Sequence, residues 1–292
     1  MVSTRETFIP FKKLPLSNDY MFCEVMRNPL ICRLFLESLL HREIERIEYI
    51  TKQQDLSESY ISHGIRVDVY LKDDKNTVYS IEMQCTGVLH IFKRIRYYQG
   101  AIDRNNLKKG QYYTLLPETF IIMICTFDPF GHGMAVYERE IRIKDCPDVR
   151  YDDDSHVFLL NSAYKTGNAD KPVLEFLDCI RSNNVNAGDY SSALMKEVCP
   201  KIEEIRNDPS KEAEYMIWET KLMDMKWEGI AIGEARGEAR GEARGIEQGV
   251  KAMVNTLRKM SVDPGVVAKQ LCEQFGMPLQ AASEKVAQYW TP

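Results

Sequence analysis

An aspartate and a glutamate stand opposite each other in a predicted β-hairpin, the stretch "RVDVYLKDDKNTVYSIEMQ" at 66–84. Two runs of alternating polar and apolar residues flank the polar turn "DDKNT" at 73–77, a pattern typical of paired strands. With the turn centred on Lys75, Asp68 pairs with Glu82. Like charges directly opposite each other on neighbouring strands are destabilising. Something must therefore hold these two carboxylates in place.

Side chains alternate between the two faces of the predicted hairpin. The apolar face, which predicts contact with a core, carries Val67, Val69, Leu71, Tyr79, Ile81 and Met83. The polar face carries Arg66, Asp68, Tyr70, Ser80, Glu82 and Gln84. The hairpin therefore predicts one face that packs and one face that does chemistry.

A divalent cation explains the facing carboxylates. Two carboxylates about 5 Å apart repel each other by roughly 3 kcal/mol at an effective dielectric constant of about 20. A cation between Asp68 and Glu82 turns this repulsion into attraction, and oxygen ligands suit Mg²⁺ or Mn²⁺. The backbone carbonyl of Met83 offers another oxygen. Two alternatives stay open: a solvated acidic face, or neutralisation of Asp68 by Arg66 without a metal.

The rest of the chain predicts the elements that position this pair. Apolar spacing at 17–40 predicts a helix with an Asn or Asp cap, interrupted at Pro29. Another helix, at 89–110, ends at Gly110. Strands are predicted at 44–50, 120–127, 134–143 and 156–161. The apolar run "FIIMICTF" in the second of these suits a strand buried on both faces. The sequence from 171 onwards is helical, so we expect an α/β core with a helical tail.

Glycines recur every four residues in "GIAIGEARGEARGEARGIEQG" at 229–249. On a helix this period makes one row of Glu234, Glu238 and Glu242 and another row of Arg236, Arg240 and Arg244. Each row repels itself, and each glycine costs about 1 kcal/mol relative to alanine. A neighbouring copy repairs such a helix, because glycine allows close approach and a glutamate row can face an arginine row. The repeat predicts a homo-oligomerisation helix, and a flexible spacer is the alternative.

Composition and charge exclude several classes of protein. The net charge of −5 gives no general affinity for nucleic acids, so such binding needs a local basic surface. The longest apolar runs are too short to cross a bilayer, and the N-terminal stretch lacks the apolar segment of a secretion signal. The eight cysteines stand singly, without a CxxC pair. This spacing disfavours a zinc site or a disulfide framework and favours reduced thiols in the cytoplasm.

Several stretches occur in an order that points to one family. They are "LSNDYMFCEVM" (16–26), "GIRVDVYL" (64–71), "IEMQ" (81–84), "KRIRYYQGAI" (93–102), "LKKGQYYTLLP" (107–117) and "TFDPFGHG" (126–133). Together they resemble the PD-(D/E)XK nuclease superfamily, and within it the recombination-promoting nucleases that are often labelled transposases. The resemblance implies a restriction-endonuclease-like core, a central mixed sheet flanked by helices with the active site at one edge. The predicted helical tail is then a C-terminal extension.

The resemblance also implies metal-dependent hydrolysis of DNA phosphodiester bonds by Mg²⁺ or Mn²⁺. Asp68 and Glu82 match the metal ligands, and Asp19 matches an acidic residue near the metal. For Asp19, a plain helix cap is the alternative. Gln84 stands where the superfamily name has lysine. Glutamine offers an amide dipole without a charge, so through its carbonyl it orients a water molecule but cannot act as a base.

The predicted helix at 89–110 is basic and directly follows the strand with Glu82. Arg94 and Tyr98 share one face of it, which predicts contact with a scissile phosphate or with Gln84. Phosphate contacts give affinity with little sequence preference. The predicted nucleic-acid-binding residues are Arg66, Lys93, Arg94, Arg96 and Tyr98. A solvated basic face, with its tyrosines packed on the sheet, is the alternative.

We expect four parts: a nuclease-like domain (1–180), a helical extension (181–228), the repeat helix (229–250) and a small helical module (251–292). Within the module, the spacing of short predicted helices and turns at 253–286 is typical of a helix-turn-helix. A capping or interaction bundle is the alternative. The expected function is a metal-dependent DNA endonuclease linked to recombination or mobile elements. A catalytically silent DNA-binding or assembly protein, and an RNA-directed nuclease, are alternatives on the same fold.

Overall fold

The computed structural model describes residues 9–49, 68–85, 87 and 90–290. The chain divides into two compact units, Met1–Tyr215 and Met216–Pro292. The four predicted parts, with boundaries after residues 180, 228 and 250, stay predictions.

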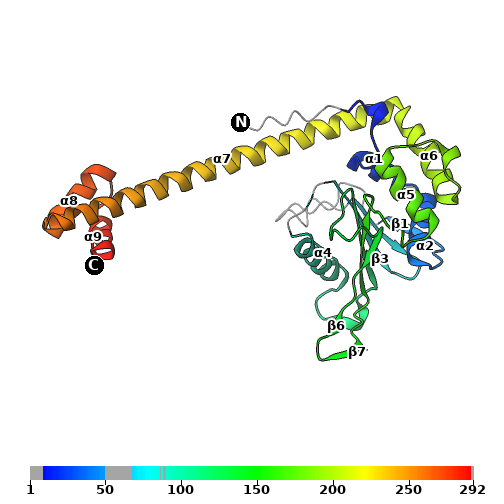
Figure 1. The fold of residues 1–292 in the computed structure, drawn as a ribbon, viewed down its shortest axis with the longest axis horizontal. Helices are drawn as coiled ribbons and strands as arrows, with labels where there is room; N and C mark the ends of the chain where they lie inside the picture. The colour runs from blue at the N-terminus through cyan, green and yellow to red at the C-terminus, as the bar shows by residue number, and fades with distance from the viewer. Residues whose placement is uncertain (1–8, 50–67, 86, 88–89, 291–292) are drawn as a thin grey trace. The chain divides into compact units, whose positions relative to one another are not determined.

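A six-stranded sheet forms the centre of the first unit (Figure 1). Its strands are β1 (Ile47–Tyr49), β2 (Val69–Asp73), β3 (Val78–Gln84), β4 (Thr119–Cys125), β5 (Val136–Glu138) and β8 (Ser155–Asn161). They lie in the order β1-β2-β3-β4-β8-β5. The pairs β3–β4 and β4–β8 are parallel, and the other neighbours are antiparallel. This mixed sheet, flanked by helices, confirms the predicted α/β core.

A smaller sheet joins β6 (Arg142–Ile143) to β7 (Cys146–Arg150). The strand β7 was not predicted, because its sequence "CPDVR" contains proline and aspartate, which are depleted in strands.

The β2–β3 hairpin has the predicted register. Val69 lies opposite Ile81, and the pairing continues to Lys72 and Val78. The turn is held by Asp73, whose Oδ1 accepts hydrogen bonds from the backbone amides of Lys75 (2.9 Å) and Thr77 (2.8 Å). A turn this tightly bonded leaves little freedom for the strands to slip, which is why the register could be read from the sequence.

Helix α4 (Ile91–Asn106) covers the hairpin face that was predicted to be polar (Figure 1). Its buried residues are Ile91, Ile95, Tyr98 and Ile102. They pack against Tyr70, Val78, Ile121, Met123, Cys125, Val157 and Leu159 of the sheet. Every residue of β3 is therefore buried, on both faces. The alternative of a solvated acidic face is wrong. The predicted helix end at Gly110 is also wrong: α4 ends at Asn106, and Gly110 lies in the following turn with φ +88°.

The other side of the sheet carries helices α1 (Asp19–Met26), α2 (Pro29–Leu40), α5 (Lys171–Ser182) and α6 (Ala193–Arg206) (Figure 1). The predicted break at Pro29 is confirmed, because Asn28 caps α2 and Pro29 fills its first turn. Phe35 of α2 and Phe176 of α5 pack with ring centroids 5.0 Å apart. The helical layer thus has its own packed interior.

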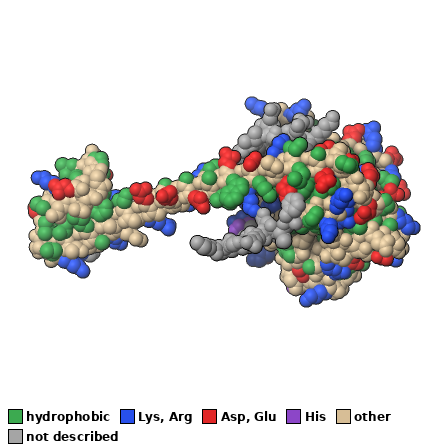
Figure 2. Space-filling view, turned by 90° about the horizontal axis from the view of Figure 1, so that it is seen from above, with side chains coloured by type: hydrophobic (Ala, Val, Ile, Leu, Met, Phe, Trp, Pro, Cys, Tyr) green, Lys and Arg blue, Asp and Glu red, His purple; other side chains and the backbone are tan. Residues whose placement is uncertain are grey.

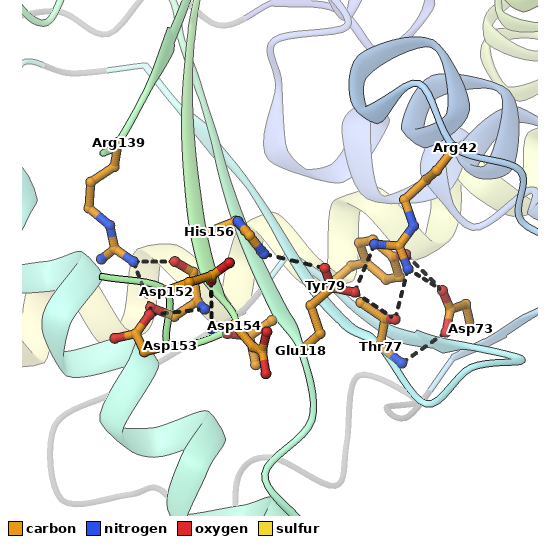
Figure 3. A network of polar contacts seen from close by, with 12 residues as sticks. Arg42, Asp73, Thr77, Tyr79, Glu118, Arg139, Asp152, Asp153, Asp154 and His156 are labelled. Carbon is orange, nitrogen blue, oxygen red and sulfur yellow. Dashed lines mark hydrogen bonds and ion pairs between the residues drawn. The ribbon is translucent and has the colours of Figure 1, made fainter. Parts of the chain in front are cut away.

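A polar network ties the amino-terminal ends of the parallel strands together (Figure 3). Arg42 Nη1 donates to Glu118 Oε2 at 2.8 Å, and the Arg42 guanidinium lies 3.6 Å from Asp73. The Tyr79 hydroxyl donates to Asp73 Oδ2 at 2.8 Å, and His156 Nε2 lies 3.3 Å from Glu118 Oε1. This network fixes the end of the sheet opposite to the end where Gln84 lies.

Three short 3-10 helices, η1 (Phe11–Lys13), η2 (Tyr113–Leu115) and η3 (Ala187–Asp189), complete the first unit. Helix α7 (Pro209–Lys259) begins in this unit, where Tyr215 packs against Phe11 and Tyr20. The prediction of an almost wholly helical sequence from 171 onwards is confirmed.

The second unit contains the rest of α7 with α8 (Pro264–Phe275) and α9 (Leu279–Tyr289). Its core includes Val250, Val254, Val267, Leu271, Ala282 and Val286. Residues 220–246 of α7 are all exposed, and Figure 2 shows acidic, basic and hydrophobic side chains along this helix. All three tryptophans of the chain, Trp218, Trp227 and Trp290, belong to this unit. Within the described residues, no helix combines the length and apolar character that membrane crossing needs.

Candidate nuclease site

The carboxyl-terminal ends of the parallel strands define the edge where the predicted site residues lie. Gln84 ends β3 and lies beside Cys125, the last residue of β4, which in turn lies beside Asn161 of β8. Glu82 lies two residues before Gln84 on the same strand, and α4 begins a few residues after Gln84. In open α/β sheets ligands bind outside the carboxyl ends of the strands.

Glu82 is the most constrained carboxylate of this edge. Its residue is 1% exposed, and its Oε1 has no hydrogen-bond partner among the described residues. Burial raises the pKa of Glu82 well above its usual value, and the nearby Asp68 and Asp19 carboxylates raise it further. Arg94 acts in the opposite direction. The site therefore holds a negative charge that the protein alone only partly compensates.

Asp68 immediately precedes β2 and reaches towards β3. Its Oδ2 accepts a hydrogen bond from the backbone amide of Met83 at 2.8 Å. Its backbone carbonyl accepts a hydrogen bond from the thiol of Cys23 on α1 at 3.4 Å. Asp68 is thus fixed between β3 and α1, in the neighbourhood of Glu82 that the register predicted.

Asp19 occupies the first turn of α1 and is not its cap. The cap is Asn18, whose Oδ1 accepts hydrogen bonds from the amides of Tyr20 (3.1 Å) and Met21 (3.3 Å). The alternative of Asp19 as a plain cap is therefore wrong. The effect of Asp19 on the pKa of Glu82 places its charge near that of Glu82.

Arg94 of α4 joins the glutamine and the glutamate of the site. Its Nη1 donates to Gln84 Oε1 at 2.5 Å, and its Nη2 lies 3.3 Å from Glu82 Oε2. Because a guanidinium can only donate, it fixes the glutamine with its oxygen towards Arg94. The Gln84 carbonyl thus accepts one hydrogen bond from the protein, and its expected role in orienting a water molecule stays a prediction. Its amide nitrogen makes no hydrogen bond within the described residues.

The other predicted nucleic-acid-binding residues fall into three groups. Lys93 and Arg96 are exposed on the outer side of α4. Tyr98 is only 5% exposed, and its hydroxyl accepts a hydrogen bond from Arg94 Nε at 2.6 Å. Its predicted contact with nucleic acid is corrected, because packing against the sheet turns it inward to hold Arg94. Arg66 lies outside the described residues.

Two thiols near the site were given no role from the sequence. Cys23 donates to Asp68, as described above, and Cys85 Sγ donates to the carbonyl of Ser17 at 3.0 Å. Both contacts link the α1 region to the strands that carry the carboxylates. Single dispersed cysteines carry no spacing signal, so the sequence could not identify these contacts.

The donor set fits a hard divalent cation. Asp68 and Glu82 offer carboxylate oxygens, and one buried oxygen of Glu82 has no protein partner in the described part of the chain. Across the same described residues, no group of three or more Asp, Glu, His and Cys side chains is arranged to hold a metal ion. Two carboxylates therefore need further ligands from the backbone or from water, as Mg²⁺ sites commonly have.

Comparison with known proteins adds one match. The family described as PD-(D/E)XK nuclease family transposases matches residues 16–228, a span that contains every site residue discussed above. No curated protein and no solved structure matches the chain. The mixed sheet with flanking helices fits the restriction-endonuclease-like fold that this family implies. The match covers more than half of the 292 residues, and the chain belongs to the PD-(D/E)XK nuclease family transposases.

Proposed function

We propose that this protein is a metal-dependent endonuclease that hydrolyses DNA phosphodiester bonds in recombination or in the movement of mobile elements. The observation that carries this proposal is Glu82, a buried carboxylate near two further carboxylates, with one oxygen that no group of the described residues hydrogen-bonds. Such an arrangement destabilises the metal-free protein and becomes favourable when a cation binds. Its place in a nuclease family supports the same reading.

The groups that would hold Mg²⁺ or Mn²⁺ are Asp68, Glu82 and the backbone carbonyl of Met83. Asp19 lies near enough to Glu82 for its charge to raise the pKa of Glu82. When bound, the metal lowers the pKa of a coordinated water molecule and stabilises negative charge on the phosphate. The Met83 amide holds the Asp68 carboxylate by its Oδ2.

Arg94 supplies the positive charge that lysine gives to the superfamily motif. It reaches the glutamine position from α4 and lies against both Gln84 and Glu82. Because the Gln84 carbonyl accepts a hydrogen bond from Arg94, the amide N–H groups of Gln84 remain as donors for a substrate. We assign them to a phosphate oxygen, on which charge grows during hydrolysis. Lys93 and Arg96, exposed on α4, contact the neighbouring phosphates.

Cleavage of supercoiled plasmid DNA tests the proposal. The full chain is expected to nick or linearise the plasmid with Mg²⁺ or Mn²⁺ and to be inactive in EDTA. Glu82→Gln and Asp68→Asn are expected to abolish cleavage. Glu138→Gln, a matched change of an exposed glutamate on β5, is expected to leave cleavage unchanged.

Three other results would contradict the proposal. Cleavage that persists in Glu82→Gln points to another site or to a contaminating nuclease. DNA binding without cleavage identifies a silent DNA-binding or assembly protein. Cleavage restricted to RNA identifies an RNA-directed nuclease.

We also propose that two copies associate in parallel through residues 229–249. A Cβ atom added at Gly229, Gly233, Gly237, Gly241 or Gly245 meets nothing within 4 Å, so this side of α7 has room for a partner. On the helix the glycines lie between the arginine row and the glutamate row. When two parallel copies face each other across their glycines, each arginine row meets the partner's glutamate row, whereas antiparallel copies place like charges together.

The free thiols of the chain suit a reducing cytoplasm, where we place this assembly.

A further inference from the structure

Two exposed phenylalanines form a platform at the start of α4. Phe92 is 59% exposed and Phe130 is 37% exposed. Their ring centroids are 5.7 Å apart with planes inclined by 34°. Large aromatic side chains are normally buried, so two adjacent exposed rings indicate a binding surface.

The fold holds Phe130 in this position. Its ring packs edge-on against Tyr137 of β5, with centroids 4.7 Å apart, and Tyr137 packs against the core that α4 and the sheet form together. The Tyr137 hydroxyl donates to Asp128 Oδ1 at 2.8 Å, and Asp128 also accepts the backbone amides of Phe130 (3.1 Å) and Gly133 (2.6 Å). The turn "TFDPFGHG" is therefore a bonded support for one exposed ring. Gly131 and Gly133 adopt the left-handed conformations that it requires.

The platform lies next to exposed basic side chains, on the helix that also carries Arg94 of the candidate site. Phe92 lies two residues before Arg94 in the sequence. The guanidinium of Arg94 contacts Gln84 and Glu82. Lys93 and Arg96 are exposed next to it, and Arg96 lies one helical turn after Phe92 on the same face. Any chain of phosphates held by these two cations runs past the two rings.

We infer that the platform of Phe92 and Phe130 stacks unpaired nucleobases, and that the substrate at the site is single-stranded DNA; the inference rests on the proposed function for the reaction itself. In a duplex the bases are stacked on each other and present only their edges, so exposed ring faces have nothing to stack on. In a single strand every base has a free face, and successive bases stack on aromatic side chains while cations follow the backbone. Here two neighbouring exposed rings lie next to two exposed cations, Lys93 and Arg96.

Binding without cleavage tests this inference. The full chain in EDTA is titrated with labelled oligo(dT) and with duplex of equal length, and a 2-aminopurine base reports stacking. We expect binding to the single strand to be about tenfold tighter, with quenched 2-aminopurine emission. Phe92→Leu and Phe130→Leu are each expected to weaken single-strand binding at least about fivefold and to leave duplex binding unchanged.

Tyr112→Leu is the matched control. Tyr112 is 80% exposed but follows the other end of α4, which lies about 21 Å of helix from Phe92, so its loss is expected to leave single-strand affinity unchanged. Equal losses for single strand and duplex, or no loss in the phenylalanine variants, would overturn the inference. Where a leucine variant shows a lowered unfolding midpoint, Phe92→Trp decides, because it keeps an aromatic face. Retained affinity in that variant supports stacking, and lost affinity overturns it.

The outcomes separate this inference from the proposed function. Single-strand binding that depends on the two rings, in a protein that never cleaves, refutes the endonuclease and leaves the platform intact. Cleavage that is unaffected by the loss of either ring refutes the platform and leaves the endonuclease intact.

Discussion

Glu82 is the residue at which the fold and the chemistry compete. A buried carboxylate is stable only when its oxygens are hydrogen-bonded or neutralised, and here Arg94 satisfies one oxygen while the other has no partner in the described chain. The protein thus stores an unfavourable interaction at the place where the reaction is proposed to occur. Such strain is expected at functional sites and is offset elsewhere in the structure.

Replacing Glu82 is therefore expected to stabilise the metal-free protein. Its folded-state pKa is raised above the unfolded value of 4.5, so between these two pKa values the folded state binds more protons. The free energy of unfolding then falls as pH rises through the folded pKa, and the favourable contribution is complete only below about 4.5. In EDTA at pH 7 we expect Glu82→Gln to raise the free energy of unfolding by about 1–3 kcal/mol. Each kcal/mol corresponds to a rise of about 2–4 °C in Tm.

Differential scanning calorimetry from pH 4 to pH 8 provides the measurement. The difference between Glu82→Gln and the unchanged chain should disappear at the acidic end, where Glu82 is protonated in both states. A difference that is constant with pH, or a variant that is less stable at pH 7, contradicts the assignment. Glu138→Gln, on the exposed side of β5, should show no difference at any pH.

Arg94 is expected to matter more for turnover than for DNA affinity. Arg94→Gln removes the charge beside Gln84 and Glu82 and should lower kcat by about 100-fold, the usual cost of losing one donor that acts on developing charge. Gln84→Lys placed in the same chain restores a cation at the motif position and should recover part of the loss. Single-turnover cleavage at saturating DNA measures both variants. A loss seen only in KM would mean that Arg94 binds DNA without acting on the reacting phosphate.

At the scale of single elements, local pattern predicted the hairpin well. The tight turn fixed the register, and the unbroken apolar run of β4 indicated a strand buried on both faces, which the structure confirms. Local pattern could not show that α4 would cover the polar face of β3, because spacing within one element does not determine which face of a sheet a helix packs against. The same reason explains why Tyr98 was predicted to be on a nucleic-acid surface although it is buried.

The charge rows of α7 give a prediction for this helix as an element. Changing Arg236, Arg240 and Arg244 together to glutamate leaves only acidic side chains beside the glycines and should abolish self-association. Changing Glu234, Glu238 and Glu242 together to arginine should do the same. An equimolar mixture of the two variants should form a heterodimer, because every acidic row of one variant then faces a basic row of the other.

Analytical ultracentrifugation of each variant and of the mixture measures the association. The parallel arrangement is contradicted if the mixture stays monomeric while the unchanged chain is dimeric. Association that persists after deletion of 229–249 contradicts any role of the repeat.

At the scale of the whole molecule, the first unit contains the sheet, the carboxylates and α4, and its packing extends into the first turns of α7 through Tyr215. The family match ends within α7 as well, at residue 228. A chain shortened to residues 1–228 is therefore expected to keep its fold. Its cleavage rate per protomer at saturating DNA should change by less than about twofold, and its self-association should be lost.

Circular dichroism and plasmid cleavage check this expectation. A shortened chain that fails to fold would show that the second unit is needed for the stability of the first. A folded chain without activity would show that the site depends on association.

Sequence reasoning worked best where one local feature determines the outcome, and least well where several distant elements meet. The family resemblance identified Asp68 and Glu82 as expected metal ligands, and the hairpin spacing predicted that they lie opposite each other. Three features depend on how α4, β3 and β5 pack together: the Glu82 oxygen without a partner among the described residues, the bond from Arg94 to the Gln84 carbonyl, and the exposed ring of Phe130. Such properties have no counterpart in residue spacing, so they could only be found in the folded structure.

The distribution of tryptophan makes the second unit optically separate. Because Trp218, Trp227 and Trp290 all lie after Tyr215, indole emission excited at the red edge of absorption comes from that unit alone. Trp227, which is strongly exposed on α7, should emit at long wavelength in a single copy. Titrating DNA onto the sheet-containing unit should leave this signal unchanged, so any response of the indoles to DNA would report communication along the chain.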